Sequence, residues 1–381
     1  MLPSPSIYLD HHATTPTDPR VLEEMLPYFS QYFGNAGSRH KYGFRAATGV
    51  EQARSRVATL LHCEPGEVVF TSGATEADNL ALKGFVAGCS KPPHVISTVA
   101  EHRAVLDPLK RLAREGIDVT ILPVDREGRV SAADVEAAIR PETKLVSVIL
   151  ANNEIGSINP LEEICEVCHS RGILLHSDAT QAVGKIEVDL RKIPVDLLSL
   201  SAHKLYGPQG IGALIVRDNV NPIRLLPLIE GGGQERRLRS GTLPVPLVVG
   251  LGKACELAGS EMQEEANRLE NWRERMWSRI RTALPGTRRN TPVRNALPHN
   301  LNVTFDKIDG EQLLRLLQDV AVSSGAACSS AEPRPSHVLQ AIGLTEQEAK
   351  SSIRIGLGRF NEEAEIDYAV DYLIRTVRSL Q

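Results

Sequence analysis

Between residues 67 and 216, short apolar runs rich in β-branched residues alternate with amphipathic stretches of helical period. This alternation predicts a mainly parallel sheet with helices on both faces. Such a sheet binds its ligands at the carboxyl ends of the strands. The expected strands are Val68–Thr71, His94–Val99, Val119–Leu122, Leu145–Leu150, Ile173–His176, Val195–Leu200 and Gly212–Val216, and helices are expected at Ala74–Ala87, Ala104–Arg114 and Leu161–Arg171.

The pattern changes after about residue 258, where a long charged helical segment precedes mixed short strands and helices. A chain of 381 residues is also too long for one simple core. We therefore expect an α/β protein with a large domain at 15–257 and a smaller α+β domain formed by residues 1–14 and 258–381. The later elements are expected at Ser260–Leu284, Leu301–Phe305, Gly310–Gln318, Ile353–Ile355 and Glu362–Ser379, with a loop at Ser323–Pro335.

The composition is that of an ordinary soluble protein, with 42% hydrophobic and 24% charged residues and a formal net charge of -4. This charge favours neither nucleic acid nor an anionic membrane as a partner. The N-terminus lacks the basic and apolar regions of a secretory signal. The six cysteines are scattered, so a disulfide framework is not expected. The prediction is a cytoplasmic protein without membrane contact.

The segment Thr71–Asn79 follows an expected strand and opens an expected helix. A helix N-terminus offers unpaired backbone N–H groups and a positive dipole end, and Ser72 and Thr75 add hydroxyl donors. This arrangement is typical of a phosphate cradle. Taken alone, a Ser or Thr at this place is more often only a helix cap.

Asp178 and Lys204 fall at the ends of two successive expected strands. A lysine that bonds covalently to the cofactor and a carboxylate that keeps the pyridine nitrogen protonated are what pyridoxal 5'-phosphate requires. Each residue alone would be an ordinary surface or capping residue; the pair with a phosphate cradle favours the cofactor. His102 and Asn153 follow two further strands at the same edge, and a histidine there suits ring stacking and proton transfer.

Two further patterns resemble metal or haem sites. The stretch from Cys165 to His169 matches a haem-attachment pattern, but Leu161, Ile164, Cys165 and Cys168 share one helical face, which favours buried core residues. His11 and His12 form an isolated pair without converging ligands. We expect no metal site.

Eight motifs resemble those of cysteine desulfurases of the NifS/IscS type, in the same order and at similar spacing. These enzymes belong to the class-V aminotransferase group of fold-type I pyridoxal-phosphate enzymes, and the resemblance covers nearly the whole chain. The motifs are SGATEADN, EHRAVL, NNEIG, DATQAVGK, SAHKLYGPQGIGAL, GGGQERRLRSGTLP, SSGAACSS and SSIRIGLGRF.

The resemblance implies roles for individual residues. Lys204 would bind the cofactor covalently, Asp178 would hold the pyridine nitrogen, Gln181 would face the ring hydroxyl and His102 would stack on the ring as an acid/base group. The other implied cofactor contacts are Ala74, Thr75, Asn153, Ser201, His203 and, from the second subunit of a homodimer, Thr242.

The same resemblance implies that Asn35 and Arg354 bind the carboxylate of L-cysteine, and that Cys328 takes its sulfur as a persulfide and leaves L-alanine. A sulfur-acceptor protein such as an iron–sulfur scaffold would receive the sulfur; tRNA-modifying partners are the one expected link to nucleic acid. Cys328 is also a candidate transient ligand of an iron–sulfur cluster. Chain departures from the usual family pattern are Ala36, Gln209 and Ala326.

Other functions stay open at this point. Selenocysteine lyase or another class-V aminotransferase activity is the alternative within the family, and Cys328 in its loop disfavours an aminotransferase. A non-catalytic scaffold for sulfur assembly is the alternative from another class. The intact set of Lys204, Asp178, His102 and Cys328 disfavours a scaffold.

Overall fold

The computed structural model describes residues 7–217, 223–324 and 335–381. Its largest sheet has seven strands in the order β2-β8-β7-β6-β5-β3-β4. The strands are β2 (Val68–Thr71), β3 (His94–Thr98), β4 (Asp118–Leu122), β5 (Thr143–Ser147), β6 (Leu174–Asp178), β7 (Leu197–Ser201) and β8 (Gly212–Val216). All seven lie within two or three residues of the predicted runs.

The sheet is mainly parallel, as predicted. Strands β4, β3, β5, β6 and β7 pair in parallel, so their carboxyl ends meet at one edge. Only β8 runs in the opposite direction, antiparallel to both β7 and β2. The short connection from Lys204 to β8 is too brief for the crossover that a parallel neighbour needs, so β8 returns as a hairpin partner of β7.

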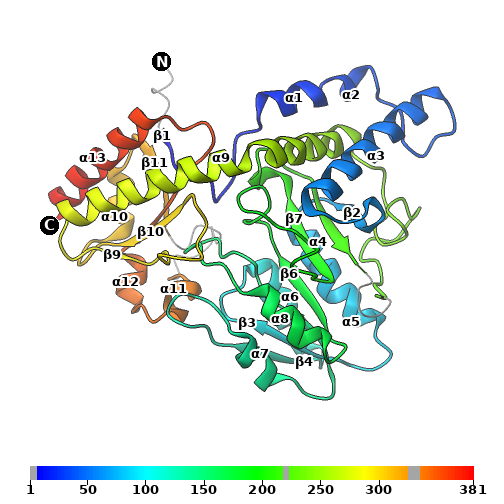
Figure 1. Ribbon diagram of the computed structural model, residues 1–381, viewed down its shortest axis with the longest axis horizontal. Helices are drawn as coiled ribbons and strands as arrows, with labels where there is room; N and C mark the ends of the chain where they lie inside the picture. Colours follow the sequence, from blue (N-terminus) through cyan, green and yellow to red (C-terminus); the bar gives the residue numbers. More distant parts are fainter. Residues whose placement is uncertain (1–6, 218–222, 325–334) are drawn as a thin grey trace.

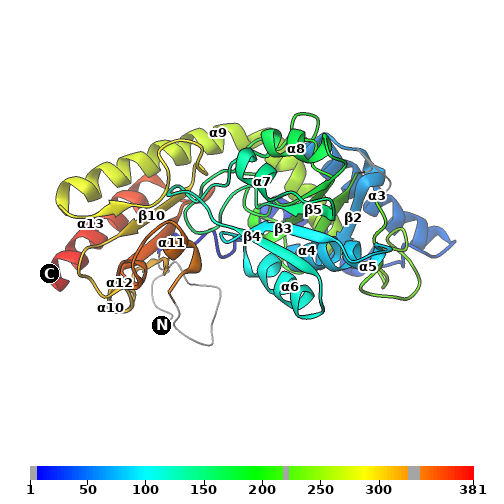
Figure 2. The same ribbon diagram turned by 90° about the horizontal axis from the view of Figure 1, so that it is seen from below.

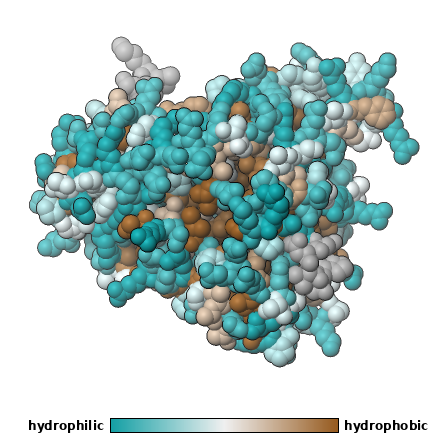
Figure 3. Space-filling model, viewed as in Figure 1, coloured by the Kyte–Doolittle hydropathy of each residue, from teal (hydrophilic) through white to brown (hydrophobic). Residues whose placement is uncertain are grey.

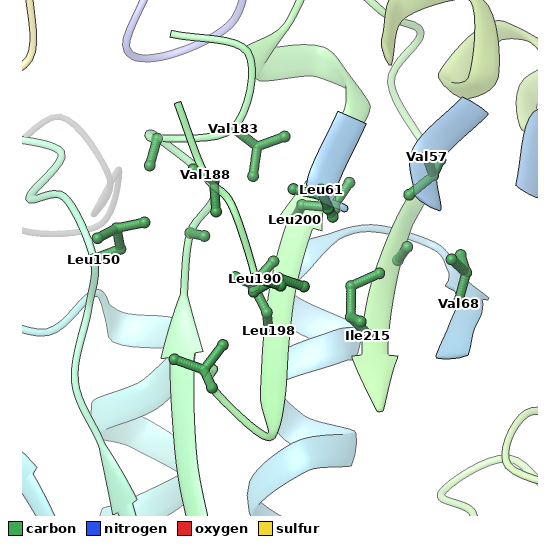
Figure 4. Packing of buried hydrophobic residues seen from close by; sticks show 14 of the residues in the cluster. Val57, Leu61, Val68, Leu150, Val183, Val188, Leu190, Leu198, Leu200 and Ile215 are labelled. Carbon is green, nitrogen blue, oxygen red and sulfur yellow. The ribbon is translucent and has the colours of Figure 1, made fainter. Parts of the chain in front are cut away.

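Helices cover both faces of this sheet, because alternate residues of each strand point to opposite sides. Val68 and Phe70 enter one core with helices α3, α7, α8 and α9, while Val69 enters the other with α4, α5 and α6. Figure 4 shows the first core, with Leu61 of α3 near Leu200 of β7. The bounds are α3 (Lys41–Leu61), α4 (Ala74–Asn79), α5 (Phe85–Gly88), α6 (Arg103–Arg114), α7 (Ala132–Ala138), α8 (Leu161–His169) and α9 (Val245–Ala283), with η1 (Pro65–Glu67), η2 (Leu80–Gly84) and η3 (Ala202–Lys204) between them.

A smaller unit with its own core follows at the C-terminal side, formed by a four-stranded antiparallel sheet and a two-stranded parallel one. Leu9 from the N-terminal stretch belongs to this second core. Its elements are β1 (Ile7–Tyr8), β9 (Arg288–Arg289), β10 (Asn300–Thr304), α10 (Gly310–Leu316), β11 (Val320–Ala321), β12 (Ser323–Ser324), α11 (His337–Ala341), α12 (Glu346–Lys350), β13 (Ser352–Gly356) and α13 (Glu363–Leu380).

Helix α9 runs through both units, as Figures 1 and 2 show. Its first half contributes Val248 and Leu251 to the core of the large sheet, and its second half contributes Leu269 and Met276 to the second core. The sequence predicted a helix only from Ser260. The proposed boundary near 257 and 258 therefore lies inside a continuous helix.

The N-terminal helices α1 (Pro19–Met25) and α2 (Pro27–Ser30) lie beside α3 at one end of the molecule (Figure 1). Asp18 caps α1 through its carboxylate, which accepts the N–H of Arg20. Within the described parts of the chain, no helix is both long and apolar enough to cross a membrane.

Candidate active site

A cavity of about 630 Å³ opens where β6 and β7 end and α4 begins. Residues that the sequence placed at separate strand ends meet in its lining, because the parallel strands end at one edge. The predicted residues found there are Ala74, Thr75, His102, Asn153, Asp178, Gln181, Ser201, His203 and Lys204. His12, Thr14 and Gln209 line it as well.

One end of the cavity is formed by the start of α4. The residue before the helix is Gly73, with a φ of 152°, and no side chain caps the first turn. The first N–H groups of α4 are therefore available to an anion, as at other phosphate-binding helix termini. Ser201 and His203 line the same cavity, and the ring of His203 contacts the hydroxyl of Thr14 at 3.1 Å.

The carboxylate of Asp178 ends β6 inside the cavity and is 4% exposed. One of its oxygens accepts the N–H of Thr180 at 2.9 Å, which fixes the side chain. Behind it lie two fully buried groups, His176 and Asp78, whose nearest ring nitrogen and oxygen are 3.5 Å apart. Burial and then the charge of Asp178 raise the pKa of Asp78 well above its usual range, which favours the neutral form of Asp78.

Lys204 follows β7 in the short turn η3. Its ammonium group donates to the carbonyl oxygens of His12 and Ala13, the second at 2.9 Å. The N-terminal stretch thus lies directly over the lysine, and its carbonyls hold the side chain in the cavity.

His102 precedes α6 and caps it. Its Nδ1 accepts the N–H of Ala104 at 3.1 Å, so the proton of the neutral ring sits on Nε2. The preceding Glu101 is fully buried, and its Oε1 accepts from Thr98 and from the N–H of Ile149, both at 2.8 Å. Burial raises the pKa of Glu101 to about 8. These hydrogen bonds hold the backbone at Glu101 and the ring of His102 in place.

Arg354 lies on β13 of the smaller unit and is buried beside the cavity. Its guanidinium donates to the carbonyl of Asn153 at 3.0 Å and pairs with Asp10 at 3.0 Å. Its Nε has no hydrogen-bond partner among the residues that the structure describes. A buried cation with a spare donor is suited to a carboxylate ligand.

Two other predicted site residues are exposed and do not line the cavity. Asn35 is exposed and its side chain accepts the N–H of Gly37 at 2.9 Å. Thr242 is exposed and does not line the cavity within one chain. Cys328 lies outside the described residues.

The structure confirms the core interpretation of Cys165 and Cys168. Both are buried in the first core, and burial raises the pKa of each thiol. In the described ranges, no group of three or more His, Cys, Asp or Glu side chains is arranged for a metal ion.

Sequence reasoning missed His12 as a site residue. Its ring contacts Gln181 and Asn300, which are 169 and 288 residues away in the chain. No local pattern could reveal such partners, since both lie far from His12 in the sequence.

The cavity satisfies the requirements of pyridoxal phosphate on the residues present. It offers an uncapped helix start for the phosphate, a buried carboxylate for the pyridine nitrogen, a lysine for the aldehyde carbon and a neutral histidine. Fold and cavity together define a pyridoxal-phosphate-dependent enzyme.

Comparison with known proteins agrees with this class. A model of the family "Aminotransferase class-V" matches residues 7–369. A mitochondrial cysteine desulfurase of Arthroderma benhamiae is 51% identical over 368 residues, which cover 96% of this chain and 73% of the relative. A solved NifS-like protein superimposes with a TM-score of 0.92 at 38% identity, covering 98% of this chain and all of that one. The solved structure "SspA in complex with cysteine" superimposes with a TM-score of 0.81 at 39% identity, covering 92% and 99%.

The chain therefore belongs to the class-V aminotransferase family of pyridoxal-phosphate enzymes.

Proposed function

We propose that the protein is a cysteine desulfurase that converts L-cysteine to L-alanine and passes the sulfur on as a persulfide. The convergence of Lys204, Asp178 and His102 in one cavity carries this proposal. Substrate cysteine is supported by the relative named for this activity and by the similar structure solved with cysteine.

The proposed cofactor contacts are distributed around the cavity. The first turn of α4, with Ala74 and Thr75, binds the phosphate together with Ser201 and His203, and Asp178 holds the pyridine nitrogen. When bound, the cofactor draws electrons from the substrate's α-carbon. Lys204 Nζ and His102 Nε2 move protons there, because both reach the cavity and the ring of His102 is held by its other nitrogen.

Arg354 is the proposed anchor of the substrate carboxylate, supported by its burial, its fixed guanidinium and its spare Nε donor. Asn35 is proposed as the second member of this clamp. Asn35 is exposed on the segment before α3, which would allow it to contact the substrate in the proposed homodimer.

Cys328 is the proposed sulfur acceptor. Its thiolate attacks the sulfur of the bound substrate, so that a sulfur–sulfur bond forms while the carbon–sulfur bond breaks, and a proton delivered to the carbon completes alanine. The other five cysteines are poor candidates, because burial raises the pKa of each of their thiols. They are Cys63, Cys89, Cys165, Cys168 and Cys255.

A homodimer is proposed from the exposed apolar side chains on the region of α1 to α3, part of which is visible as a small light-brown area on the projecting end in Figure 3. Such a patch on a soluble protein marks an interaction surface. Phe33 and Phe44 are 65% and 61% exposed. Thr242 is proposed to complete the phosphate site of the partner subunit, since it is exposed and does not line the cavity of its own chain.

For the sulfur acceptor we propose an iron–sulfur scaffold protein, with a tRNA-modifying enzyme as a further recipient. Cys328 would act as a transient cluster ligand in the first case. A cytoplasmic location is proposed from the sequence, although the relative from Arthroderma benhamiae is named as mitochondrial.

The test is to incubate the purified protein with L-cysteine and a reductant and to measure alanine and sulfide together. Equal amounts of both are expected from the parent. Lys204→Ala is expected to abolish turnover and the visible absorption of the bound cofactor. Full activity of Lys204→Ala would overturn the cofactor assignment.

A further inference from the structure

The ring of His12 lies between Gln181, at the edge of the cavity, and Asn300, on strand β10 of the smaller unit. His12 and Asn300 are 1% and 0% exposed, and the polar atoms of both rest on contacts with other protein groups. His12 also stacks on His299, with ring centroids 4.3 Å apart. The ring is therefore fixed in position, and the direction of its hydrogen bonds follows from its partners.

The backbone N–H of Asn302 can only donate, and this sets the direction of the hydrogen bonds that follow. The N–H of Asn302 donates to the hydroxyl oxygen of Thr291 at 2.8 Å, so the hydroxyl hydrogen of Thr291 is free to donate to Oδ1 of Asn300, also at 2.8 Å. The amide nitrogen of Asn300 then has two hydrogens to place. It donates one to the carbonyl of Glu154 at 3.2 Å and the other to Nε2 of His12 at 3.1 Å.

Because Nε2 of His12 accepts, the proton of the neutral ring sits on Nδ1. Burial, and then the nearby charge of Arg354, lower the pKa of His12 well below its usual range, which agrees with a neutral ring. The other charged or titratable groups that act on the ring come from Lys204, His11 and His299. Nδ1–H therefore donates to Oε1 of Gln181 at 3.1 Å.

Gln181 is thereby held at both ends by one residue. Its Oε1 accepts from the ring of His12, and its Nε2 donates to the backbone carbonyl of His12 at 3.0 Å. If the amide were reversed, its NH₂ group would face the Nδ1–H donor of His12, and its oxygen would face the backbone carbonyl of His12. One hydrogen of Nε2 is left for a ligand in the cavity that Gln181 lines.

We propose that His12 is a positioning residue that fixes the amide of Gln181 as a hydrogen-bond donor toward the ring oxygen of the cofactor. This inference rests on the proposed role of Gln181 in the site. A fixed donor stabilises the ionised form of that oxygen. The chain of hydrogen bonds from Thr291 through Asn300 and His12 to Gln181 is called the relay. Through this relay, the orientation of Gln181 depends on two residues of the smaller unit.

The test is a pH titration of the visible absorption band of the dimeric holoenzyme. His12→Leu removes the donor without adding volume, and it should raise the pKa of the band by about one unit, the size expected for a lost hydrogen bond to an ionised group. His12→Asn keeps an N–H near the place of Nδ1 and should stay within about 0.3 units of the parent. Cofactor affinity should fall about tenfold in His12→Leu only.

His11→Leu is the matched control, since this equally buried histidine bonds to the carbonyl of Gly356 instead of Gln181. An unchanged pKa in His12→Leu, or an equal rise in His11→Leu, would overturn the inference. If His12→Leu does not fold, Asn300→Leu releases the same relay from its other end; a rise supports the inference and no rise overturns it. A parent without any visible band would instead contradict the cofactor assignment itself.

Discussion

The ammonium group of Lys185 lies 3.0 Å from the carboxylate of Glu265, and both side chains are almost completely buried. The same carboxylate pairs with Arg359 at 2.8 Å and accepts the hydroxyl of Tyr206 at 2.9 Å. Tyr206 stands two residues after Lys204, and its ring is contacted by both cations. Glu265 of α9 therefore anchors the segment that carries Lys204.

This anchor predicts a large loss of stability in Glu265→Gln. The change leaves two buried cations without their shared carboxylate, which should lower the free energy of unfolding by about 3–5 kcal/mol. Urea unfolding at neutral pH, followed by circular dichroism, measures the loss. The matched control is Glu187→Gln, which removes an exposed partner of Lys192 and should change stability by less than about 1 kcal/mol. Equal effects of the two changes would contradict the assigned importance of the buried cluster.

The same carboxylate predicts an acid-sensitive stability. Burial raises the pKa of Glu265, but Lys185 and Arg359 outweigh it and lower the value to about 2. A carboxyl whose pKa is lower in the folded state stabilises the fold above its unfolded value near 4.5, and this contribution is lost as the pH falls from there toward 2. The parent should lose about 3 kcal/mol over this range through Glu265, a loss that Glu265→Gln should lack. If the free energy of unfolding fell equally with pH in both proteins between pH 5 and 2, the prediction would be wrong.

His102 is expected to act on rate more than on cofactor binding. His102→Gln keeps a polar side chain at the start of α6 but cannot transfer protons near neutral pH, so kcat should fall by about 10²–10⁴-fold. The absorption of the bound cofactor should remain, since Lys204 and Asp178 are unchanged. A parental kcat in this variant would remove His102 from the mechanism.

The sequence predicted the sheet well because its strands are buried runs of β-branched residues, which carry a strong local signal. Helices α1 to α3 were not predicted, and α9 was predicted to start fifteen residues late. The first half of α9, with Val248, Val249 and Leu251, is buried against α3 and lacks the polar face that makes an amphipathic helix recognisable.

The site divides in the same way. Asp178, Lys204 and His102 were predictable because each follows its own strand, and parallel strands bring such positions to one edge. His12 was not, because its partners Gln181 and Asn300 come from distant elements and nothing local marks the contact. A residue whose contacts form only in the folded chain cannot be identified from its neighbours in the sequence.

A shared active site predicts complementation between inactive subunits. If Thr242 serves the partner's phosphate site, a dimer of one Thr242→Ala chain and one Lys204→Ala chain has one intact site and one doubly damaged site. Random mixing makes about half of the dimers mixed, so about a quarter of the sites should regain activity. The parents alone, at equal total concentration, give the baseline for cysteine turnover. If mixed dimers are isolated with two different tags and show no gain, Thr242 acts within its own chain or not at all.

Cys328→Ser separates cofactor chemistry from sulfur transfer. Lys204, Asp178 and His102 lie at one edge of the large sheet, so removing this sulfur should leave the absorption spectrum of the holoenzyme and its response to added cysteine intact. A serine hydroxyl is a weak nucleophile at its normal pKa and cannot hold a persulfide. Alanine production should therefore be almost abolished, by up to about 10⁶-fold as for loss of a nucleophile elsewhere, and no sulfur from labelled cysteine should remain on the protein. Cys89→Ser is the matched control and should transfer sulfur at the parental rate, because its half-buried thiol has a raised pKa. Alanine formed at the parental rate by Cys328→Ser under reductant would move the nucleophile to another cysteine.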